Sequence, residues 1–255
     1  MTTPGYIEVL FSLVLVALAI GLTVWWKIPV QKDMSLGSVR AFVQLVAVGY
    51  VLKYIFDLES VPLIFLAILI MITVGAHTAA SRVKKNIRGA FYIAFAAIIS
   101  GSAVTLVTMI LLDIITFEAR YVIPLAGMIV SNSMNATTLT INRITSDINS
   151  NRLAIETALS LGKSWRAATL SFQREAAVAG MISVLNFMKT VGIVALPGAM
   201  TGMILAGAEP LDAVLFQIIV AYMLLSVTTI SSIVALEMSV RRFFTPNHQL
   251  VLRGR

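Results

Sequence analysis

The chain contains no cysteine, only two histidines and few charged residues for its length. The absence of cysteine excludes structural disulfides and metal sites built on thiolates. Charged side chains make up 12% of the 255 residues, against roughly 25% in soluble domains. Hydrophobic residues account for 58% and the mean hydropathy is +0.93. This composition is that of an integral membrane protein.

No motif for catalysis or nucleotide binding is complete in the sequence. Neither a His/Glu metalloprotease motif nor a Ser/His/Asp set is present. The residues LGKS at 161–164 match the end of a phosphate-binding loop, but Thr157 replaces its first glycine. We therefore expect a non-catalytic chain that binds no cofactor, so ATP and Mg²⁺ would be bound by another subunit. The net charge of +7 fits membrane topology, and no nucleic-acid partner is expected.

Apolar runs long enough to cross a bilayer, roughly 20 residues each, recur along the whole chain. They predict an all-α polytopic transmembrane bundle of about seven spans, at residues 5–26, 39–57, 60–80, 90–112, 121–141, 176–207 and 211–240. No polar linker divides the chain. Residues 1–255 are therefore predicted to form one transmembrane domain, interrupted by a polar helical hairpin at 142–175.

Lysine and arginine gather on one side of this predicted topology. Most of the 19 basic residues lie at 27–40, 82–88, 143–174 and 241–255. The alternate loops are mainly acidic, with Asp57, Glu59, Asp113, Glu118, Glu209 and Asp212. Because basic loops stay in the cytoplasm, we expect the N-terminus outside and the C-terminus and hairpin in the cytoplasm. A multi-pass protein of the cell membrane, in bacteria the cytoplasmic membrane, is the expected localisation, with the basic tail near membrane lipid.

The hairpin at 142–175 has signals for two helices and a turn. Asn151 is placed to cap a helix that begins at Arg152, and Gly162 to end it. Ser164 is placed to cap a second helix. A short helix with one apolar face suits either a groove on a partner protein or the inner face of the membrane.

The residues ETALSLG at 156–162 resemble the coupling loop of ABC transporter permeases, which has Glu, two small residues, three spacers and Gly. In such permeases this loop docks into a groove on a separate ATPase subunit. The resemblance implies that the coupling surface includes Glu156, Ala158, Leu159 and Gly162. Ile155, Ala158 and Leu159 share one helix face by their spacing. An amphipathic helix lying on the inner membrane face is the alternative.

Longer blocks, in order along nearly the whole chain, are similar to the FetB-type permeases. They are RAFVQLVAVGYVLKYIF (40–56), IPLAGMIVSNSMNATTL (123–139), KTVGIVALPGAMTGMILAG (189–207) and HQLV (248–251). This family comprises membrane subunits of a bacterial ABC system assigned to iron export. Plant relatives are linked to aluminium tolerance, and one is linked to UDP-glucose transport.

The resemblance implies a permease subunit that forms a homodimer, works with two separate ATPase subunits and exports iron or another metal. Export of a nucleotide sugar such as UDP-glucose is the alternative. An ATP-independent carrier or a structural membrane protein is an alternative of another class. Asn186 stands where the family often has Asp, and this change removes an anionic oxygen that a metal route would use.

Polar and sulfur-bearing residues within the predicted spans are candidates for the substrate path, because polar groups in lipid are costly. They are Gln44, Asn132, Asn135, Asn186, Lys189, Met200 and Met203. The asparagines have a structural alternative in hydrogen bonds between helices. Lys189 also has one, at the inner boundary of the membrane, if its helix begins in the cytoplasm. Alternatively, Pro197 and Gly198 break the run 176–207 and leave a half-helix after it.

Two other features of the spans have open interpretations. Gly198, Gly202 and Ala206 are spaced by four, so they form a small-residue stripe that serves either packing within the chain or a dimer seam. His77 is the only histidine within a predicted span. It is a candidate metal ligand, with a hydrogen-bonded structural role as the alternative.

Overall fold

The computed structural model of the chain describes residues 5–58, 60–83, 87, 89–245, 247 and 249–251. These residues form nine α-helices and one 3-10 turn, and the only β-pairing among them is two isolated bridges. The all-α class is therefore confirmed. Lys84, Lys85, Arg88 and His248, which entered the topology and family predictions, lie outside the described residues. The chain divides into two compact units, Met1–Ser60 and Val61–Arg255, which we describe separately.

The first unit is a pair of helices, α1 (Tyr6–Trp25) and α2 (Gln31–Leu58). The connection between them turns at Lys27, whose φ of 54° is left-handed, and the Gln31 side chain donates a hydrogen bond to the Thr23 carbonyl at 3.2 Å. With 28 residues, α2 is about 42 Å long. Most side chains of the two helices are exposed within the unit, as expected for surfaces that face lipid.

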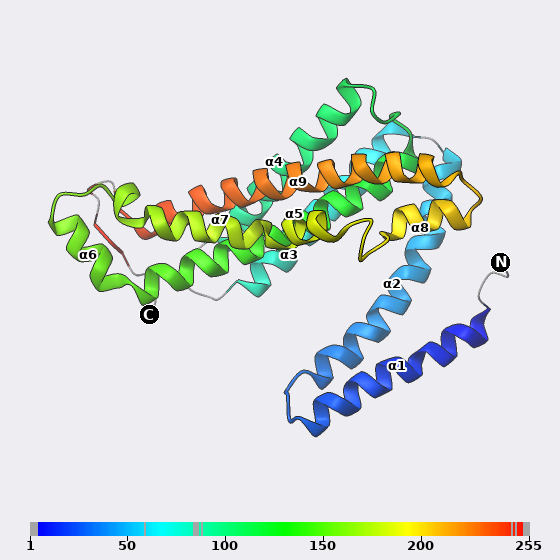
Figure 1. The fold of residues 1–255 in the computed structure, drawn as a ribbon, viewed down its shortest axis with the longest axis horizontal. Coiled ribbons are helices and arrows are strands. Elements are labelled where there is room, and N and C mark those ends of the chain that lie inside the picture. The colour runs from blue at the N-terminus through cyan, green and yellow to red at the C-terminus, as the bar shows by residue number, and fades with distance from the viewer. Residues whose placement is uncertain are drawn as a thin grey trace. The chain divides into compact units, whose positions relative to one another are not determined.

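The second unit is a helical bundle with a short helix at each end (Figure 1). Its long helices are α3 (Val61–Arg82), α4 (Ala90–Leu111), α5 (Ala119–Ser150), α7 (Trp165–Thr190) and α9 (Pro210–Val240). The short ones are α6 (Arg152–Ser160) and α8 (Gly198–Leu205), and the 3-10 turn Arg241–Phe243 follows α9. Helix α9 packs against α4, α5 and α7, and α5 also packs against α3. The hairpin of α6 and α7 therefore extends directly from the central helices.

Small and hydroxyl side chains fill the contact between α5, α7 and α9. The buried hydroxyls of Ser133 on α5 and Ser231 on α9 lie 2.6 Å apart and hydrogen-bond to each other. Gly180 on α7 approaches its neighbours so closely that a Cβ there would collide with the hydroxyls of Thr140 and Ser232. Small residues at helix contacts let membrane helices approach closely. We call this contact the hydroxyl seam.

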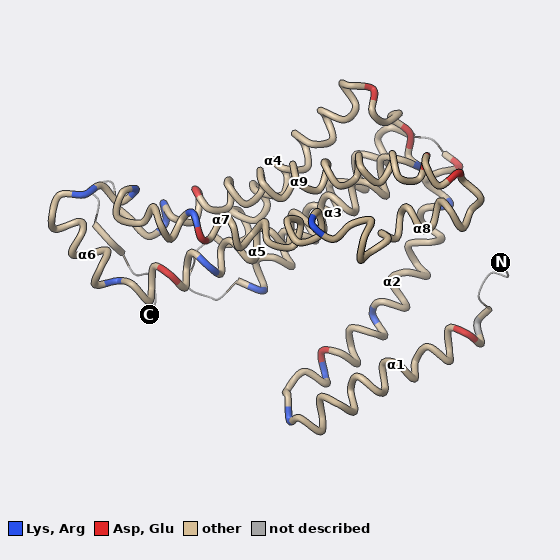
Figure 2. Tube along the Cα trace, in the orientation of Figure 1, with Lys and Arg blue, Asp and Glu red and all other residues tan. Residues whose placement is uncertain are grey.

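Among the described residues, five helices are long and apolar enough to cross a membrane: α1, α2, α3, α4 and α9. Helices α5 and α7 have 32 and 26 residues, so they are long enough, but their polar and charged residues lower their hydropathy. The structure therefore supports a polytopic membrane protein, while the count of seven spans and the orientation of the termini stay predictions. Within the second unit, Lys and Arg gather at the α6 end, and Asp and Glu gather at the opposite end and beside the hairpin (Figure 2).

The run 176–207 is not one continuous span. Helix α7 begins at Trp165, within the hairpin, and ends at Thr190. Residues 191–197 are not helical, and α8 starts at Gly198 with Pro197 as its N-cap. The alternative of a break followed by a half-helix from Gly198 is confirmed, but α7 ends before Pro197: Val191 is extended and Gly192 has a left-handed φ of 81°, and Pro197 then precedes α8 as its N-cap. The prediction of one uninterrupted span over 176–207 is wrong.

Candidate functional site

The hairpin between α5 and α7 is built by local signals in the sequence. Helix α6 ends at Ser160, and the amides of Gly162 and Lys163 donate to the carbonyls of Leu159 (2.9 Å) and Ala158 (3.1 Å). With a φ of +84° at Gly162, this is a Schellman C-cap, which glycine forms at little cost. The predicted end of the helix at Gly162 is confirmed.

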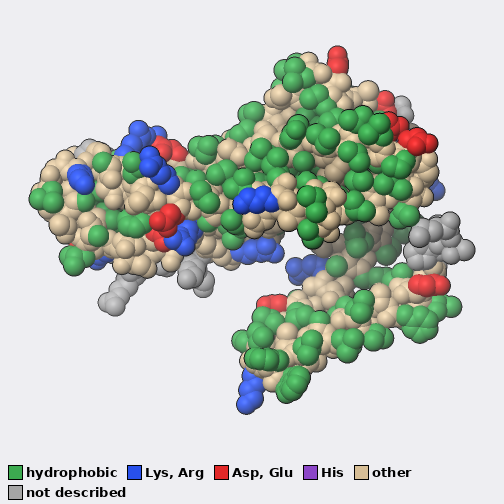
Figure 3. Space-filling model, in the orientation of Figure 1, with side chains coloured by type: hydrophobic (Ala, Val, Ile, Leu, Met, Phe, Trp, Pro, Cys, Tyr) green, Lys and Arg blue, Asp and Glu red, His purple; other side chains and the backbone are tan. Residues whose placement is uncertain are grey.

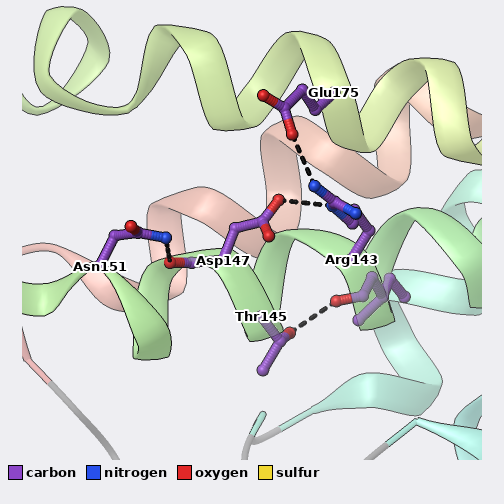
Figure 4. A network of polar contacts seen from close by, with 6 residues as sticks. Arg143, Thr145, Asp147, Asn151 and Glu175 are labelled. Atoms are coloured by element: carbon purple, nitrogen blue, oxygen red, sulfur yellow. Dashed lines mark hydrogen bonds and ion pairs between the residues drawn. The ribbon is translucent and has the colours of Figure 1, made fainter.

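The two predicted N-caps have different outcomes. The Ser164 side chain accepts a hydrogen bond from the Ala167 amide at 3.3 Å, which caps α7 as predicted. Helix α6 begins at Arg152 as expected, but the Asn151 side chain does not cap it. The Asn151 amide instead donates to the carbonyl of Asp147 at 2.8 Å (Figure 4). The physical reason is that α5 continues to Ser150, so Asn151 satisfies the carbonyl end of α5 rather than the amide end of α6.

The apolar face of α6 packs against the protein's own helices. Ile155 is fully buried and Leu159 is partly buried in a cluster with isoleucines of α5, including Ile144 and Ile148. The face that the spacing singled out therefore points into the bundle, since burying these side chains removes apolar surface from water.

Two leucines that the sequence analysis did not single out lie on the outer side of the hairpin. Leu153 is 79% exposed and Leu161 is 78% exposed, and they flank the exposed Thr157. Glu156 is half-buried and pairs with Arg152 at 2.7 Å, one turn away on the same helix. The sequence did carry a signal for this face. Leucines lie around this nine-residue helix on more sides than a single buried face can hold. We call Leu153, Thr157 and Leu161 the outer face of the hairpin.

Ion pairs join the hairpin to the helices behind it. Arg143 on α5 pairs with Asp147 at 2.8 Å and with Glu175 on α7 at 2.6 Å (Figure 4). The hydrogen bond to Asp147, its charge and the bond to Glu175 together raise the pKa of the Arg143 guanidinium above its ordinary value. Arg143 and Glu175 are about half exposed, whereas Asp147 is partly buried, so water screens the pair with Glu175 and its contribution to stability is small. Their role is geometric, because they fix α7 against α5 where the hairpin begins.

A second group of contacts fixes the start of α7 against the C-terminal end of α9. The Trp165 ring stacks on Phe244 with centroids 5.6 Å apart, and the Arg166 guanidinium lies over Trp165 at 5.1 Å. Glu237 on α9 accepts from both Arg166 (2.8 Å) and Arg241 (2.7 Å). The hairpin is thus held by α5 on one side and by α9 on the other.

The asparagines of α5 do not form a buried polar cluster. Asn132 is half-buried and its side chain donates to the Met128 carbonyl of its own helix at 2.8 Å, while Asn135 is exposed. The residue of this stretch that makes a buried contact between helices is Ser133, through Ser231. On α2 of the first unit, Gln44 is exposed.

The other candidates lie around the break between α7 and α8 or on α3. Asn186 and Lys189 are exposed near the end of α7, and Met200 and Met203 of α8 are half-buried. In the stripe of α8, Gly198, Gly202 and Ala206 are exposed. His77 is exposed on α3, and among the described residues no group of three or more His, Cys, Asp or Glu is placed to hold a metal ion.

A partly open pocket of ≈ 240 Å³ lies between the break and α9. Its lining is mainly apolar: Val191, Gly192, Leu196, Met200, Val214, Gln217, Ile218 and Ala221. Gln217 is only 5% exposed, and its side-chain oxygen has no hydrogen-bond partner in the described part of the chain. A buried amide oxygen without a partner is costly, which marks this pocket as the second candidate site.

Comparisons with known proteins cover nearly the whole chain. The Uncharacterised protein family UPF0014 matches residues 6–244. The UPF0014 membrane protein STAR2 of rice is 39% identical over 96% of this chain and 86% of its own length. The Protein ALUMINUM SENSITIVE 3 of Arabidopsis thaliana is 39% identical over 96% of this chain and 90% of its own.

A bacterial relative is equally similar. The Probable iron export permease protein FetB of Escherichia coli is 39% identical over 94% of this chain and 93% of its own length. No solved structure matches the chain. These similarities and the bundle of apolar helices lead to one assignment: the chain is a multi-pass membrane protein that belongs to the UPF0014 family, within which the FetB relative is named a permease.

Proposed function

We propose that this chain is the membrane-spanning permease subunit of an ABC transporter, with seven spans, an outer N-terminus and a cytoplasmic hairpin. The observation that carries the proposal is the hairpin of α6 and the start of α7, held by ion pairs to α5 and α9 with two leucines exposed on its outer face. Its resemblance to a coupling loop and the name of the FetB relative support the same function.

The outer face of the hairpin is the surface proposed to dock into a groove of the ATPase subunit. Leu153 and Leu161 supply apolar anchors, and the Schellman cap at Gly162 fixes the distance between them. Buried apolar anchors carry most of the binding energy at such contacts. Ile155 and Leu159 act from the inner side, where they attach α6 to the bundle.

Motion would pass from the ATPase to the spans through these contacts. Closure of an ATP-bound ATPase dimer would displace α6, and the pairs Arg143–Glu175 and Arg166–Glu237 would carry α5, α7 and α9 with it. Helix α7 is continuous from Trp165 to Thr190, so its two ends move as one body. ATP and Mg²⁺ would be bound by the ATPase, and this chain would switch the access of a central path between the two sides.

A charge on the outer face tests the docking surface. We expect Leu153→Asp to abolish co-purification of the ATPase subunit, because it places a charge in an apolar contact. Asn149→Asp, an exposed position at the end of α5, is the matched control and should leave the complex intact. Equal recovery of ATPase with both variants would show that the outer face is not the docking surface.

Iron or another metal is the proposed substrate, following the printed name of the FetB relative. A nucleotide sugar is the second candidate, and a specific observation favours it: Lys189 is exposed near the break, whereas the described residues offer no cluster of metal ligands. Stimulation of ATPase activity in reconstituted membranes, by iron salts in one arm and by UDP-glucose in the other, separates the two. Failure of both, with no ATPase bound, would favour an ATP-independent carrier.

A further inference from the structure

The break between α7 and α8 lies at membrane depth. Val191 and Gly192 line the same pocket as Gln217 and Ala221 of α9, so they lie level with that part of α9. These two α9 residues follow Pro210 by about 10–17 Å at 1.5 Å per residue. The exposed, acidic Glu209 and Asp212 mark the end of α9 from which this distance is counted. A hydrocarbon core of about 30 Å therefore places the break well inside it.

Irregular backbone at this depth does not face lipid. Residues 191–197 are not helical: the amides of 191–195 donate to nearby carbonyls, but the carbonyls of Gly192, Ile193 and Val194 accept no hydrogen bond within the described residues. Unpaired carbonyls in hydrocarbon are costly, so such a segment occurs only where protein or a water-filled cavity covers it. Yet Ile193 is 88% exposed and Val194 is 80% exposed within this unit. Figure 3 shows hydrophobic side chains over the visible face of the unit between its basic and acidic ends. Something outside the unit covers the break.

Two polar groups near the break lack partners. Lys189, in the last turn of α7, is exposed and forms no hydrogen bond or ion pair within the described residues. The side-chain oxygen of Gln217 is buried in the pocket and also unpaired there. A lysine at membrane depth is costly when it faces lipid. One group is a donor and the other an acceptor, but they do not meet within the chain.

Helix α8 carries a surface that is complementary to itself. None of its residues is buried, and no atom lies within 4 Å of the position that a Cβ would take at Gly198 or Gly202. The small-residue stripe is therefore not used for packing within the unit. Stripes with this spacing let two membrane helices approach closely, and a two-fold interface places the same patch of each copy against the other.

We propose that the α7–α8 break and the stripe of α8 form the seam against a second copy of this chain. In a two-fold pair, the Lys189 ammonium of each copy reaches the Gln217 pocket of the other, so the unpaired donor and acceptor satisfy each other. The apolar lining of the pocket suits the methylene stem of a lysine. This inference rests on the proposed permease function in one respect, which is that such a permease works as a pair of copies. The location of the seam is argued from the break between α7 and α8.

The absence of cysteine from the chain allows a direct test in the native background. Ile193→Cys and Gly202→Cys are introduced singly, with Val107→Cys as the control, because Val107 is 51% exposed on α4. Membranes are treated with copper phenanthroline or a short bismaleimide, since a disulfide alone demands Cα atoms about 4.4–6.8 Å apart. We expect bands of twice the chain mass from Ile193→Cys or Gly202→Cys, at least fivefold stronger than from Val107→Cys.

Several outcomes would overturn the seam. One is cross-linking at Val107→Cys that equals or exceeds that at the other two positions, and another is the absence of dimer bands at all three. A third is free labelling of Ile193→Cys by a membrane-impermeant maleimide without cross-linking, which would reveal a water-filled cavity. A position protected from labelling but never cross-linked would also overturn the seam, because something other than a second copy would then cover the break. Cross-linking and binding of the ATPase subunit are measured separately. If the dimer bands form but no ATPase binds, the permease function is refuted. If ATPase binds but the dimer bands do not form, the seam is refuted.

The donor–acceptor part has its own readout. In the Ile193→Cys background, Lys189→Met should lower the cross-linked fraction by more than half. Gln217→Leu should do the same, and the double variant should lose no more than either single one, because both changes remove one interaction. An unchanged fraction in Lys189→Met, or additive losses in the double variant, would refute the pairing of Lys189 with Gln217.

Discussion

The hydroxyl seam predicts a large cost for one added methyl group, in Gly180→Ala. A Cβ at Gly180 would collide with the hydroxyls of Thr140 and Ser232 and stand 3.0 Å from the Ala136 carbonyl oxygen. The Thr140 side chain is β-branched and stiff, and the carbonyl belongs to the backbone of α5. The methyl group therefore fits only if α7 moves away from α5 and α9.

The magnitude follows from the cost of overpacking. Forcing a methylene-sized group into a packed core costs about 1–3 kcal/mol. The gain in helix propensity from glycine to alanine offsets roughly 0.5–1 kcal/mol of that in a helix interior. For a chain of this size each kcal/mol lowers the melting temperature by about 2–4 °C. The net cost is about 0.5–2 kcal/mol, so we expect Gly180→Ala to melt about 1–8 °C below the parent in detergent.

Gly127→Ala is the matched control, because Gly127 lies inside α5 with nothing within 4 Å of its Cβ position. It should melt at or slightly above the temperature of the parent. Thr140→Ala should partly rescue Gly180→Ala, since it removes one of the two hydroxyls that collide. If Gly180→Ala melts no lower than Gly127→Ala, or if Thr140→Ala and Gly180→Ala are strictly additive, the close approach of α7 to α5 is refuted.

Three further substitutions address the hairpin. Ile155→Ala removes a fully buried side chain and should cost about 2–5 kcal/mol, seen as faster proteolysis at α6, whereas Leu153→Ala on the outer face should leave proteolysis unchanged. Gly162→Ala forces a left-handed φ of +84° on alanine, at about 1–2 kcal/mol, and should increase hydrogen exchange around the turn without unfolding the bundle. Arg143→Met removes two partly exposed ion pairs and should lower the melting temperature only slightly, and this difference from the parent should shrink in high salt.

Local signals in the sequence were enough to predict the ends of the hairpin. A glycine after an amphipathic stretch and a serine before the next one determine the C-cap at Gly162 and the N-cap at Ser164, because both depend on residues within one turn. Pro197 acts in the same local way at the break. Of the seven spans predicted from apolar runs, five correspond to described helices long and apolar enough to cross a membrane.

The direction in which each helix face points could not be predicted, because it depends on residues far apart in the chain. Ile155 and Leu159 point inward since the isoleucines of α5 lie behind them. Asn151 does not cap α6, because α5 continues to Ser150. The polar residues in the second half of α5 gave no apolar run from which this length could be predicted. The contact of Ser133 with Ser231 joins residues 98 positions apart, and no spacing rule relates them.

Helix α7 links the two proposed contacts mechanically. Its first turn belongs to the hairpin that would meet the ATPase, its last turn precedes the break that would meet the second copy, and Gly180 lies between them against α5 and α9. The first turn of α7 is held by a directional ion pair at Arg166 and aromatic stacking at Trp165, whereas Thr140 and Ser232 at the middle make no hydrogen bond within the described residues. A contact without directional bonds resists tilting less than one with them. A tilt of about 5° around Gly180 would move Trp165, about 22 Å away at 1.5 Å per residue, by about 2 Å, and would move the break in the opposite direction. The hairpin and the seam would then respond to one rotation, with Gly180 as its pivot.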